Sequence, residues 1–302
     1  MWLRAHGLVA YGARIRRPDA PGPYPSTVTS QWSDLSRPPL SADRLQRALA
    51  GDRLWHAVMV VASTESTNAL AAARARDGVP AGLVILAEEQ TAGRGRLDRV
   101  WQSPARAGVL MSFVLRPTTS PGTWPHLPLI AGLAALEAVI AVAHVDAALK
   151  WPNDVLVGAR KLGGILTERV DDAVVVGIGV NVSTRAEELP PEGATSLALA
   201  GGVTDREPLV KEILRSFGRR YAEWSDSGGR ASAVLPAYRE RCETIGRDIR
   251  LDLPGGRAAV GTVTNVDDEG RLVVRDAVGG EEHAWPAGDV VHTRAPTEGD
   301  RL

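Results

Sequence analysis

One stretch of the sequence, residues 93–101, gathers the side chains that an anionic ligand would need. It contains two glycines, three arginines and a tryptophan within nine residues. Glycine lets backbone N–H groups come close to a ligand, and arginine presents a planar fork that matches phosphate and carboxylate oxygens. Tryptophan adds a flat face on which a base can stack. The stretch therefore favours a nucleotide-binding loop, and a solvated basic surface loop is the alternative. The residues concerned are Gly93, Arg94, Gly95, Arg96, Arg99 and Trp101.

A second group of polar residues precedes an Ala-rich run. Ser66, Thr67 and Asn68 stand directly before residues 69–75. Side chains of these types cap the exposed N–H groups of a helix. At the positive end of the helix dipole they equally present donors to a small ligand. Gln90, which follows the apolar run 83–88, brings another amide to the start of the arginine-rich stretch.

A third group lies on a predicted three-stranded antiparallel meander over residues 149–181. Lys150, Lys161 and Asn181 would converge there. Glycine is costly inside a strand unless a ligand or another backbone comes close. The pair Gly163-Gly164 therefore points to such an approach.

The composition indicates a globular protein and excludes several classes of function. The 302 residues suggest two domains, and 44% are hydrophobic. A net charge of -1 argues against a broad nucleic-acid-binding surface. Cys242 is the single cysteine, so neither an internal disulfide nor a cysteine-based zinc site can form. No apolar segment follows Met1, and residues 127–149 are interrupted by polar side chains, so we expect a cytoplasmic protein without a membrane span.

The hydrophobic pattern predicts a mixed α+β body followed by short strands. Residues 205–226 give the clearest helix, with an apolar stripe at helical spacing. The sequence pattern changes near Glu243, and the short strands and tight turns after it indicate a small β-barrel. Helices are further expected from Ser41 to Gly51 and over 69–75, 125–143 and 231–242, and strands over 55–62, 83–88, 108–115, 249–253, 260–266 and 272–275.

Five motifs occur in one order along the chain. They are Ser66-Thr67-Asn68, Gln90 with Gly93-Arg94-Gly95-Arg96-x-x-Arg99-x-Trp101, Lys150-Trp151-Pro152-Asn153-Asp154, Lys161-Leu162-Gly163-Gly164-Ile165-Leu166 and Gly179-Val180-Asn181. Together they resemble the motifs of biotin protein ligases, also called holocarboxylase synthetases, and the resemblance covers residues 55–293. The chain lacks the paired short helices of a DNA-reading domain in its Pro-rich beginning, so it looks like the monofunctional type.

The resemblance implies a fold and a division into domains. The fold would be α+β, with a mixed, largely antiparallel sheet and flanking helices like that of class II aminoacyl-tRNA synthetases. A carboxyl-terminal SH3-like small β-barrel would follow. The expected parts are a disordered Pro-rich tail over 1–39, a catalytic biotin- and ATP-binding domain over 40–242, the SH3-like domain over 243–294 and a tail over 295–302.

The resemblance also implies a two-step reaction. Biotin and MgATP would give biotinoyl-5′-AMP and pyrophosphate, and a lysine of a biotin carboxyl carrier domain of an acyl-CoA carboxylase would then take the biotin. Biotin and ATP would be substrates and Mg²⁺ an activator, with no tightly bound prosthetic group. The partner would be the carrier domain rather than DNA or a membrane, and the enzyme a monomer or weak homodimer.

Residue roles carry over from the family motif by motif. Arg94, Arg96 and Lys161 are the expected catalytic residues, because they would stabilise charge on the phosphoryl oxygens. The resemblance implies that Ser66, Thr67, Asn68, Gln90, Gly93, Arg94, Gly95, Arg96, Lys161 and Gly164 bind biotin. It implies that Arg96, Arg99, Trp101, Asn153, Lys161 and Asn181 bind the nucleotide, that Asp154 is a metal ligand, and that Trp151 and Ile165 form apolar walls.

The pattern departs from the family at Asp98, where glycine is usual. Aspartate there adds backbone strain if the position needs a positive φ.

Two other functions remain open. One is a lipoate– or octanoate–protein ligase of the same fold, whose site must admit a longer apolar acyl chain. The other is a non-catalytic regulator that senses biotinoyl-AMP.

Overall fold

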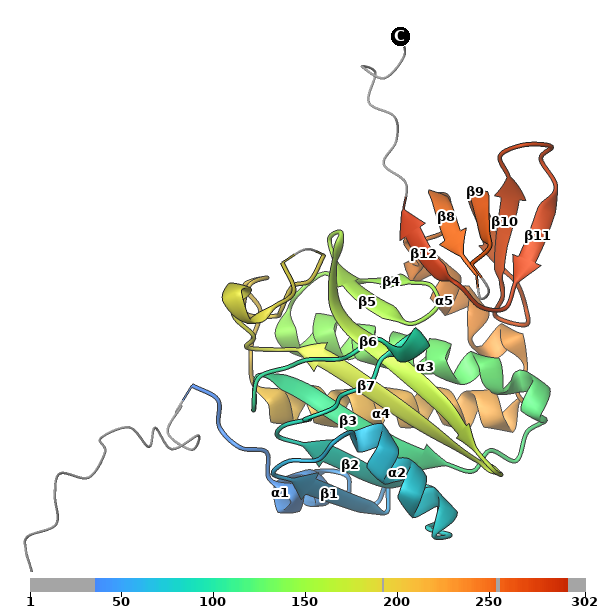
Figure 1. Ribbon diagram of the computed structural model, residues 1–302. Helices are drawn as coiled ribbons and strands as arrows, with labels where there is room; N and C mark the ends of the chain where they lie inside the picture. Colours follow the sequence, from blue (N-terminus) through green and yellow to red (C-terminus); the bar gives the residue numbers. More distant parts are fainter. Residues whose placement is uncertain (1–35, 192, 254–255, 293–302) are drawn as a thin grey trace, which may run out of the picture. The chain divides into compact units, whose positions relative to one another are not determined.

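The computed structural model describes residues 36–191, 193–253 and 256–292. Its largest element is a mixed seven-stranded sheet with the order β1-β2-β3-β7-β6-β5-β4 (Figure 1). Only β1 and β2 pair in parallel; the other neighbours are antiparallel. The strands are β1 Ala57–Val61, β2 Leu83–Ala87, β3 Gly108–Leu115, β4 Ala148–Lys150, β5 Asp154–Val157, β6 Arg160–Val170 and β7 Ala173–Asn181.

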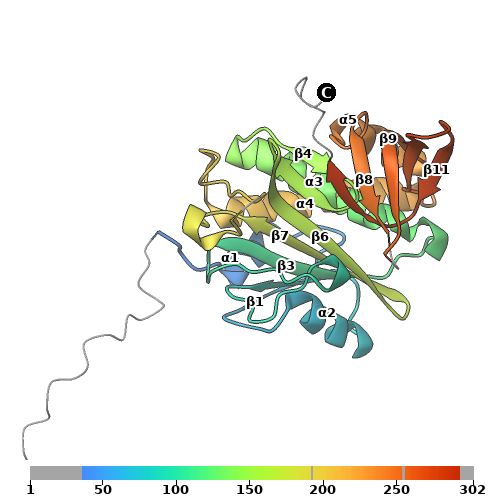
Figure 2. The ribbon, with the colours of Figure 1, turned by 45° about the horizontal axis from the view of Figure 1, so that its top comes forward.

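Helices cover both faces of this sheet. The long helices α3 and α4 pack on each other and on one face, whereas α2 lies across the other face against β3 and β7 (Figures 1 and 2). The helices are α1 Ala42–Ala48, α2 Thr67–Arg76, α3 Leu127–Ala138, α4 Arg206–Asp226 and α5 Leu235–Arg241. Short 3₁₀ turns occupy Arg96–Asp98, Pro121–His126, Ala186–Glu188 and Ala231–Ala233, and a π-helical segment, Val139–Ala143, extends α3.

The helix α3 with its flanking turns has the length and apolarity of a membrane span. Within Pro121–Ala143, an 18-residue window has a mean hydropathy of 1.9, but 72% of that window is buried inside the protein. It packs between α4 and the sheet. The expectation of a buried core helix is therefore met.

The carboxyl-terminal part forms a second, fully antiparallel sheet with the order β11-β10-β9-β8-β12. Its turn 267–270 contacts the first body: His126 Nε2 lies 2.8 Å from the Asp268 carbonyl oxygen, and Trp151 Nε1 donates to the Gly270 carbonyl oxygen at 3.0 Å. One hydrophobic core runs through both sheets. The strands are β8 Asp248–Asp252, β9 Ala258–Val266, β10 Leu272–Asp276, β11 Glu282–Trp285 and β12 Asp289–His292.

The expected elements are present, with three differences. The segment 149–157 is two strands, β4 and β5, that pair with each other, so the meander has four strands. Two strands at the carboxyl end, β11 and β12, were not anticipated. Residues 1–35 and 293–302 lie outside the described residues, but Arg37 and Leu40, placed in the expected tail or at its border, are buried in the body.

Candidate active site

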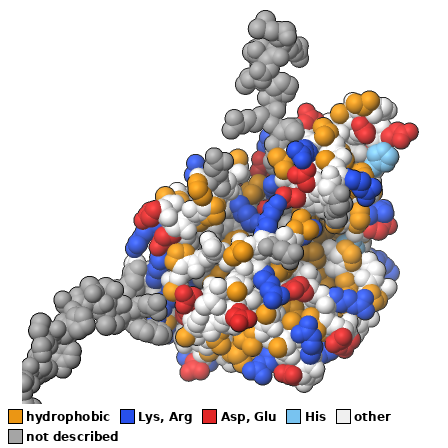
Figure 3. Space-filling model, viewed as in Figure 1, with side chains coloured by type: hydrophobic (Ala, Val, Ile, Leu, Met, Phe, Trp, Pro, Cys, Tyr) orange, Lys and Arg blue, Asp and Glu red, His pale blue; other side chains and the backbone are white. Residues whose placement is uncertain are grey.

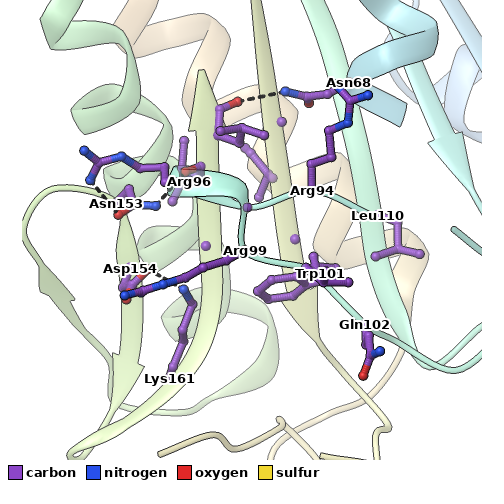
Figure 4. Close-up of a pocket in the computed structure, with 18 of the residues that line it drawn as sticks. Asn68, Arg94, Arg96, Arg99, Trp101, Gln102, Leu110, Asn153, Asp154 and Lys161 are labelled. Carbon is purple, nitrogen blue, oxygen red and sulfur yellow. Dashed lines mark hydrogen bonds and ion pairs between the residues drawn. The ribbon is translucent and has the colours of Figure 1, made fainter. Parts of the chain in front are cut away.

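A cavity of about 200 Å³ opens where the arginine-rich loop crosses the seven-stranded sheet (Figure 4). It collects side chains from the loop, the start of α2, the strands β3, β5, β6 and β7, and the segment after Asn181. Fourteen of the predicted site residues line it: Ser66, Thr67, Asn68, Gln90, Arg94, Gly95, Arg96, Arg99, Trp101, Asn153, Asp154, Lys161, Gly164 and Asn181. Segments far apart in sequence thus meet at one site, as predicted.

At one end of the cavity, buried and half-buried polar groups form a continuous hydrogen-bonded chain. Gln90 Oε1 accepts from the Thr67 backbone N–H at 2.8 Å and lies 3.0 Å from its Oγ1. The Ser112 hydroxyl lies 2.7 Å from Thr67 Oγ1 and donates to Asn68 Oδ1 at 2.6 Å. The Asn68 amide then donates to Glu168 Oε2 at 2.7 Å. Each partner is fixed by the next, so this end presents a preorganised polar wall.

Ser112 was not predicted as a site residue. Its side chain is fully buried on β3, whose other residues, Gly108–Leu115, are apolar or glycine. A single hydroxyl in such a strand is the signal that would have identified it, because buried polar groups are retained with a partner. Ser66 caps α2 by accepting from the Ala69 N–H at 3.4 Å, so capping and site lining coincide at this residue.

The opposite end of the cavity is lined by paired charges (Figure 4). Lys161 Nζ lies 2.6 Å from Asp154 Oδ1, and Arg96 donates to Asn153 Oδ1 at 3.4 Å. Burial lowers the pKa of the Arg96 guanidinium, while Asp154 and Asp289 act in the opposite direction. Cations held partly out of water interact strongly with an incoming anion. This end therefore suits phosphate groups.

Trp101 lies on a floor made by two glycines. Gly164 on β6 and Gly179 on β7 are paired directly opposite each other. A Cβ atom at Gly179 would come within 2.7 Å of the indole ring, and one at Gly164 within 3.5 Å. The ring also lies 5.8 Å from Lys161 Nζ. Every second residue of this part of β7 thus faces the cavity: Gly177, Gly179 and Asn181. The side chain of Asn68 lies over Gly177.

Gly93 has a different place from the one expected. It does not line the cavity. A Cβ atom at this position would lie 2.3 Å from the Trp101 carbonyl oxygen, and the Trp101 N–H donates to the Gly93 carbonyl oxygen at 2.9 Å. The glycine therefore closes the base of the loop instead of admitting a ligand.

The carboxyl-terminal sheet contributes Gly288 and Asp289 to the cavity, which the sequence motifs did not indicate. Arg99 forms an ion pair with the Asp289 carboxylate. The hydrogen bond to Asp289 raises the pKa of Arg99, with burial acting against it. The loop is thereby tied to the start of β12. In Figure 3, which has the view of Figure 1, basic and acidic side chains are interspersed over the face shown.

Two expected neighbours of the cavity do not line it. Lys150 lies on β4 outside the cavity, and Trp151 is buried in the hydrophobic core against the turn of the second sheet. The prediction of Trp151 as a cavity wall was therefore wrong, whereas Ile165 does line the cavity. The Asp98 side chain lies outside the described residues, and its neighbour Leu97 has a positive φ of 54°.

Comparisons with known proteins identify the family of this chain. Residues 60–184 match the Biotin/lipoate A/B protein ligase family, and residues 244–293 match the Biotin protein ligase C terminal domain. The chain is 42% identical over 267 residues to the biotin–[acetyl-CoA-carboxylase] ligase of Mycobacterium tuberculosis, covering 86% of this chain and 98% of that protein.

Solved structures share the fold of this chain. The biotin protein ligase of Aquifex aeolicus in complex with biotin and ATP matches with a TM-score of 0.68 and 26% identity, covering 78% of this chain and 99% of that one. The Leishmania major enzyme in complex with biotinyl-5-AMP matches with a TM-score of 0.52 and 28% identity, covering 76% and 98%. The chain therefore belongs to the biotin protein ligase family.

Proposed function

We propose that this protein is a biotin–[acetyl-CoA-carboxylase] ligase that activates biotin with ATP and transfers it to a lysine of a biotin carboxyl carrier domain. One observation carries the proposal: a single cavity has a hydrogen-bonded wall of hydroxyl and amide groups at one end, and Lys161 and Arg96 at the other. Such a cavity fits a small neutral ring at one end and phosphates at the other. The family relationship supports assigning this end to the ureido ring of biotin.

In the first step the biotin carboxylate attacks the α-phosphorus of ATP, and pyrophosphate leaves. Negative charge grows on the phosphoryl oxygens, so the enzyme needs positioning and positive charge rather than a nucleophile. Arg94, Arg96 and Lys161 supply that charge. Ser66, Thr67, Asn68 and Gln90 orient the ureido ring. Arg99, Trp101, Asn153 and Asn181 hold the nucleotide, and Gly95 and Gly164 let the backbone approach the ligands.

Magnesium would enter with the nucleotide. Within the described residues, no group of three or more His, Cys, Asp or Glu side chains could hold a metal ion by itself. Mg²⁺ in nucleotide sites is usually held by one or two carboxylates together with substrate phosphates. Asp154 fits that requirement, because it lines the cavity at the cationic end. There the ion would neutralise phosphate charge.

In the second step the carrier lysine attacks the mixed anhydride and AMP leaves. The anhydride reacts readily with water, so the site must stay closed until the lysine arrives. We infer that the arginine-rich loop provides this closure.

We further propose a division into domains: a catalytic domain that ends at Cys242 and an SH3-like domain over 243–294. The sheet of the catalytic domain would be related to that of class II aminoacyl-tRNA synthetases. The protein would be cytoplasmic, and a monomer or weak homodimer.

The loop gives a direct test of closure. Biotin with ATP is expected to protect residues 93–101 from trypsin, because Arg94, Arg96 and Arg99 would be ordered over bound anions. The measurement is the rate of cleavage at these arginines with and without ligands, followed by mass spectrometry. Cleavage at Arg230, far along the chain on the turn after α4, serves as the internal control. Equal cleavage of the loop in both states would contradict closure.

The decisive experiment for the function measures pyrophosphate release from ATP with biotin, with lipoate and with neither. Biotin-dependent release is expected, followed by labelling of an apo carrier domain when that domain is added. Release with lipoate alone would make the enzyme a lipoate ligase. Release with biotin but no transfer to the carrier would support a regulator that senses the adenylate.

Ser112 provides a prediction for the biotin end. Ser112→Ala removes the hydroxyl between Thr67 and Asn68, so we expect the KM for biotin to rise by roughly 3- to 10-fold, the scale of one lost hydrogen bond. The KM for ATP should change by less than about twofold, because the substitution lies at the other end of the cavity. Steady-state pyrophosphate release measures both constants. A rise in the KM for ATP alone would contradict the assignment of the two ends.

A further inference from the structure

Arg37 lies before the first helix, and its charged group is buried. Only 7% of the residue is exposed. Its guanidinium donates to Glu188 Oε2 at 2.6 Å and Oε1 at 3.3 Å, and to the Ser183 carbonyl oxygen at 2.9 Å. This is a bidentate arginine–carboxylate pair, which fixes the orientation of the two side chains as well as the distance between them. A charge removed from water in this way is costly unless it is paired, so the contact restricts both partners strongly.

The partner of Arg37 begins one wall of the cavity. We call residues 183–195 the wall segment; residue 192 in it lies outside the described residues. Glu188 ends the 3₁₀ turn Ala186–Glu188, and its Oε2 also accepts from the Arg185 backbone N–H at 2.8 Å. The next two residues, Leu189 and Pro190, line the cavity, as does Ala194. Arg37 therefore fixes Glu188, the residue that directly precedes the cavity-lining residues Leu189 and Pro190.

The far end of the wall segment is joined to residues at the cationic end of the cavity. The Lys161 N–H donates to the Gly193 carbonyl oxygen at 2.7 Å, and the Thr195 N–H donates to the Lys161 carbonyl oxygen at 2.9 Å. The Asn181 amide donates to the Thr195 carbonyl oxygen at 3.0 Å. The polar wall that includes Asn68 lies at the opposite end (Figure 4).

We propose that Arg37 is a positioning residue for the nucleotide: its ion pair with Glu188 keeps the wall segment in contact with Lys161 and Asn181. The assignment of this end to ATP rests on the proposed function. The segment before α1, which has no part in the sequence motifs, thus sets the affinity for one of the two substrates. A mobile wall would have to be ordered when ATP binds, and that entropic cost would weaken binding.

The test compares equilibrium binding of an ATP analogue with a methylene bridge between the α- and β-phosphates, which cannot release pyrophosphate. Arg37→Met keeps most of the unbranched apolar stem of the side chain and removes the guanidinium charge. We expect its Kd for the analogue to rise by about fivefold, with the Kd for biotin changed by less than about twofold. Glu188→Gln should give the same pattern, and the double variant should be no weaker than the worse single variant, because both remove one interaction.

A second ion pair near the amino terminus supplies the matched control. Arg44 on α1 pairs with Glu207 on α4 at 2.6 Å, and neither residue lines the cavity. Arg44→Met and Glu207→Gln should leave the Kd for the analogue unchanged. Hydrogen exchange in the absence of ligands should be faster in the wall segment of Arg37→Met, by about tenfold, and unchanged in Arg44→Met.

Three results would overturn the proposal: an unchanged Kd for the analogue in Arg37→Met, an equal loss of affinity for biotin, or the same loss in Arg44→Met. If Arg37→Met does not fold, Glu188→Gln decides alone, since it conserves side-chain volume. The proposed function fails separately, when wild-type protein binds the analogue but releases no pyrophosphate from ATP with biotin.

Discussion

Replacing Lys161 by alanine should slow the formation of biotinoyl-AMP by on the order of 100-fold, which corresponds to roughly 2–4 kcal/mol of lost transition-state stabilisation. Two effects add. The substitution removes a cation from the phosphate end of the cavity, and it leaves the Asp154 carboxylate, now 2.6 Å from Lys161 Nζ, without that partner. The side chain of Asp154 is only 17% exposed, so its charge would face the phosphates with little screening. Single-turnover pyrophosphate release gives the rate.

Lys211→Ala is the matched control for this prediction. Lys211 lies on α4 and does not line the cavity, so its removal should leave adenylate formation unchanged. A rate for Lys161→Ala within about threefold of the wild-type rate would remove Lys161 from the catalytic residues.

The second large effect is expected at Gly179. Gly179→Ala would place a Cβ atom 2.7 to 2.9 Å from two carbon atoms of the Trp101 ring. An indole is rigid, so it cannot bend away as a flexible side-chain tip would, and it must leave its place on the sheet. Overpacking of this kind costs about 1–3 kcal/mol. We therefore expect kcat/KM for ATP to fall by roughly 10- to 100-fold, measured by pyrophosphate release at saturating biotin.

Trp101 itself tests the cause of that loss. If Gly179→Ala acts by displacing the indole, then Trp101→Ala should give a similar loss, and the double variant should add little to either single change. Gly122→Ala is the control for glycine substitution as such, because a Cβ atom there meets nothing closer than the Ser120 hydroxyl at 3.8 Å. Fully additive losses in the double variant would show that the two residues act independently.

Local patterns in the sequence were enough to predict most of the body and most of the site. The helix α4 follows from an apolar stripe that the structure buries, and α2 from the capping residue Ser66. The Arg-Gly loop and the glycine-rich strands predict a ligand site because they break ordinary rules for loops and strands. Comparison with the family then supplies the reaction, which no spacing or periodicity could give.

The missed features depend on contacts that no local pattern records. Arg99 and Asp289 are 190 positions apart, and Arg37 and Glu188 are 151 apart. Arg37 stands in a Pro-rich stretch that indicates a tail, yet tertiary contacts bury it. Trp151 belongs to a motif rich in site residues, but its indole donates to Gly270 and joins the two sheets. The sequence predicts the second sheet, but it does not show that a turn of this sheet packs against Trp151.

The ion pair between Arg99 and Asp289 has a consequence for protein engineering. A chimaera that joins the first body of this protein to the second sheet of a relative would combine a loop and a β12 that did not evolve together. Such a hybrid would keep both sheets and still lose part of its active site, unless the carboxylate at position 289 is retained. The contact between the two parts thus lies inside the cavity. A chimaera must therefore be matched at residue 289, and not only at the connecting segment near Glu243.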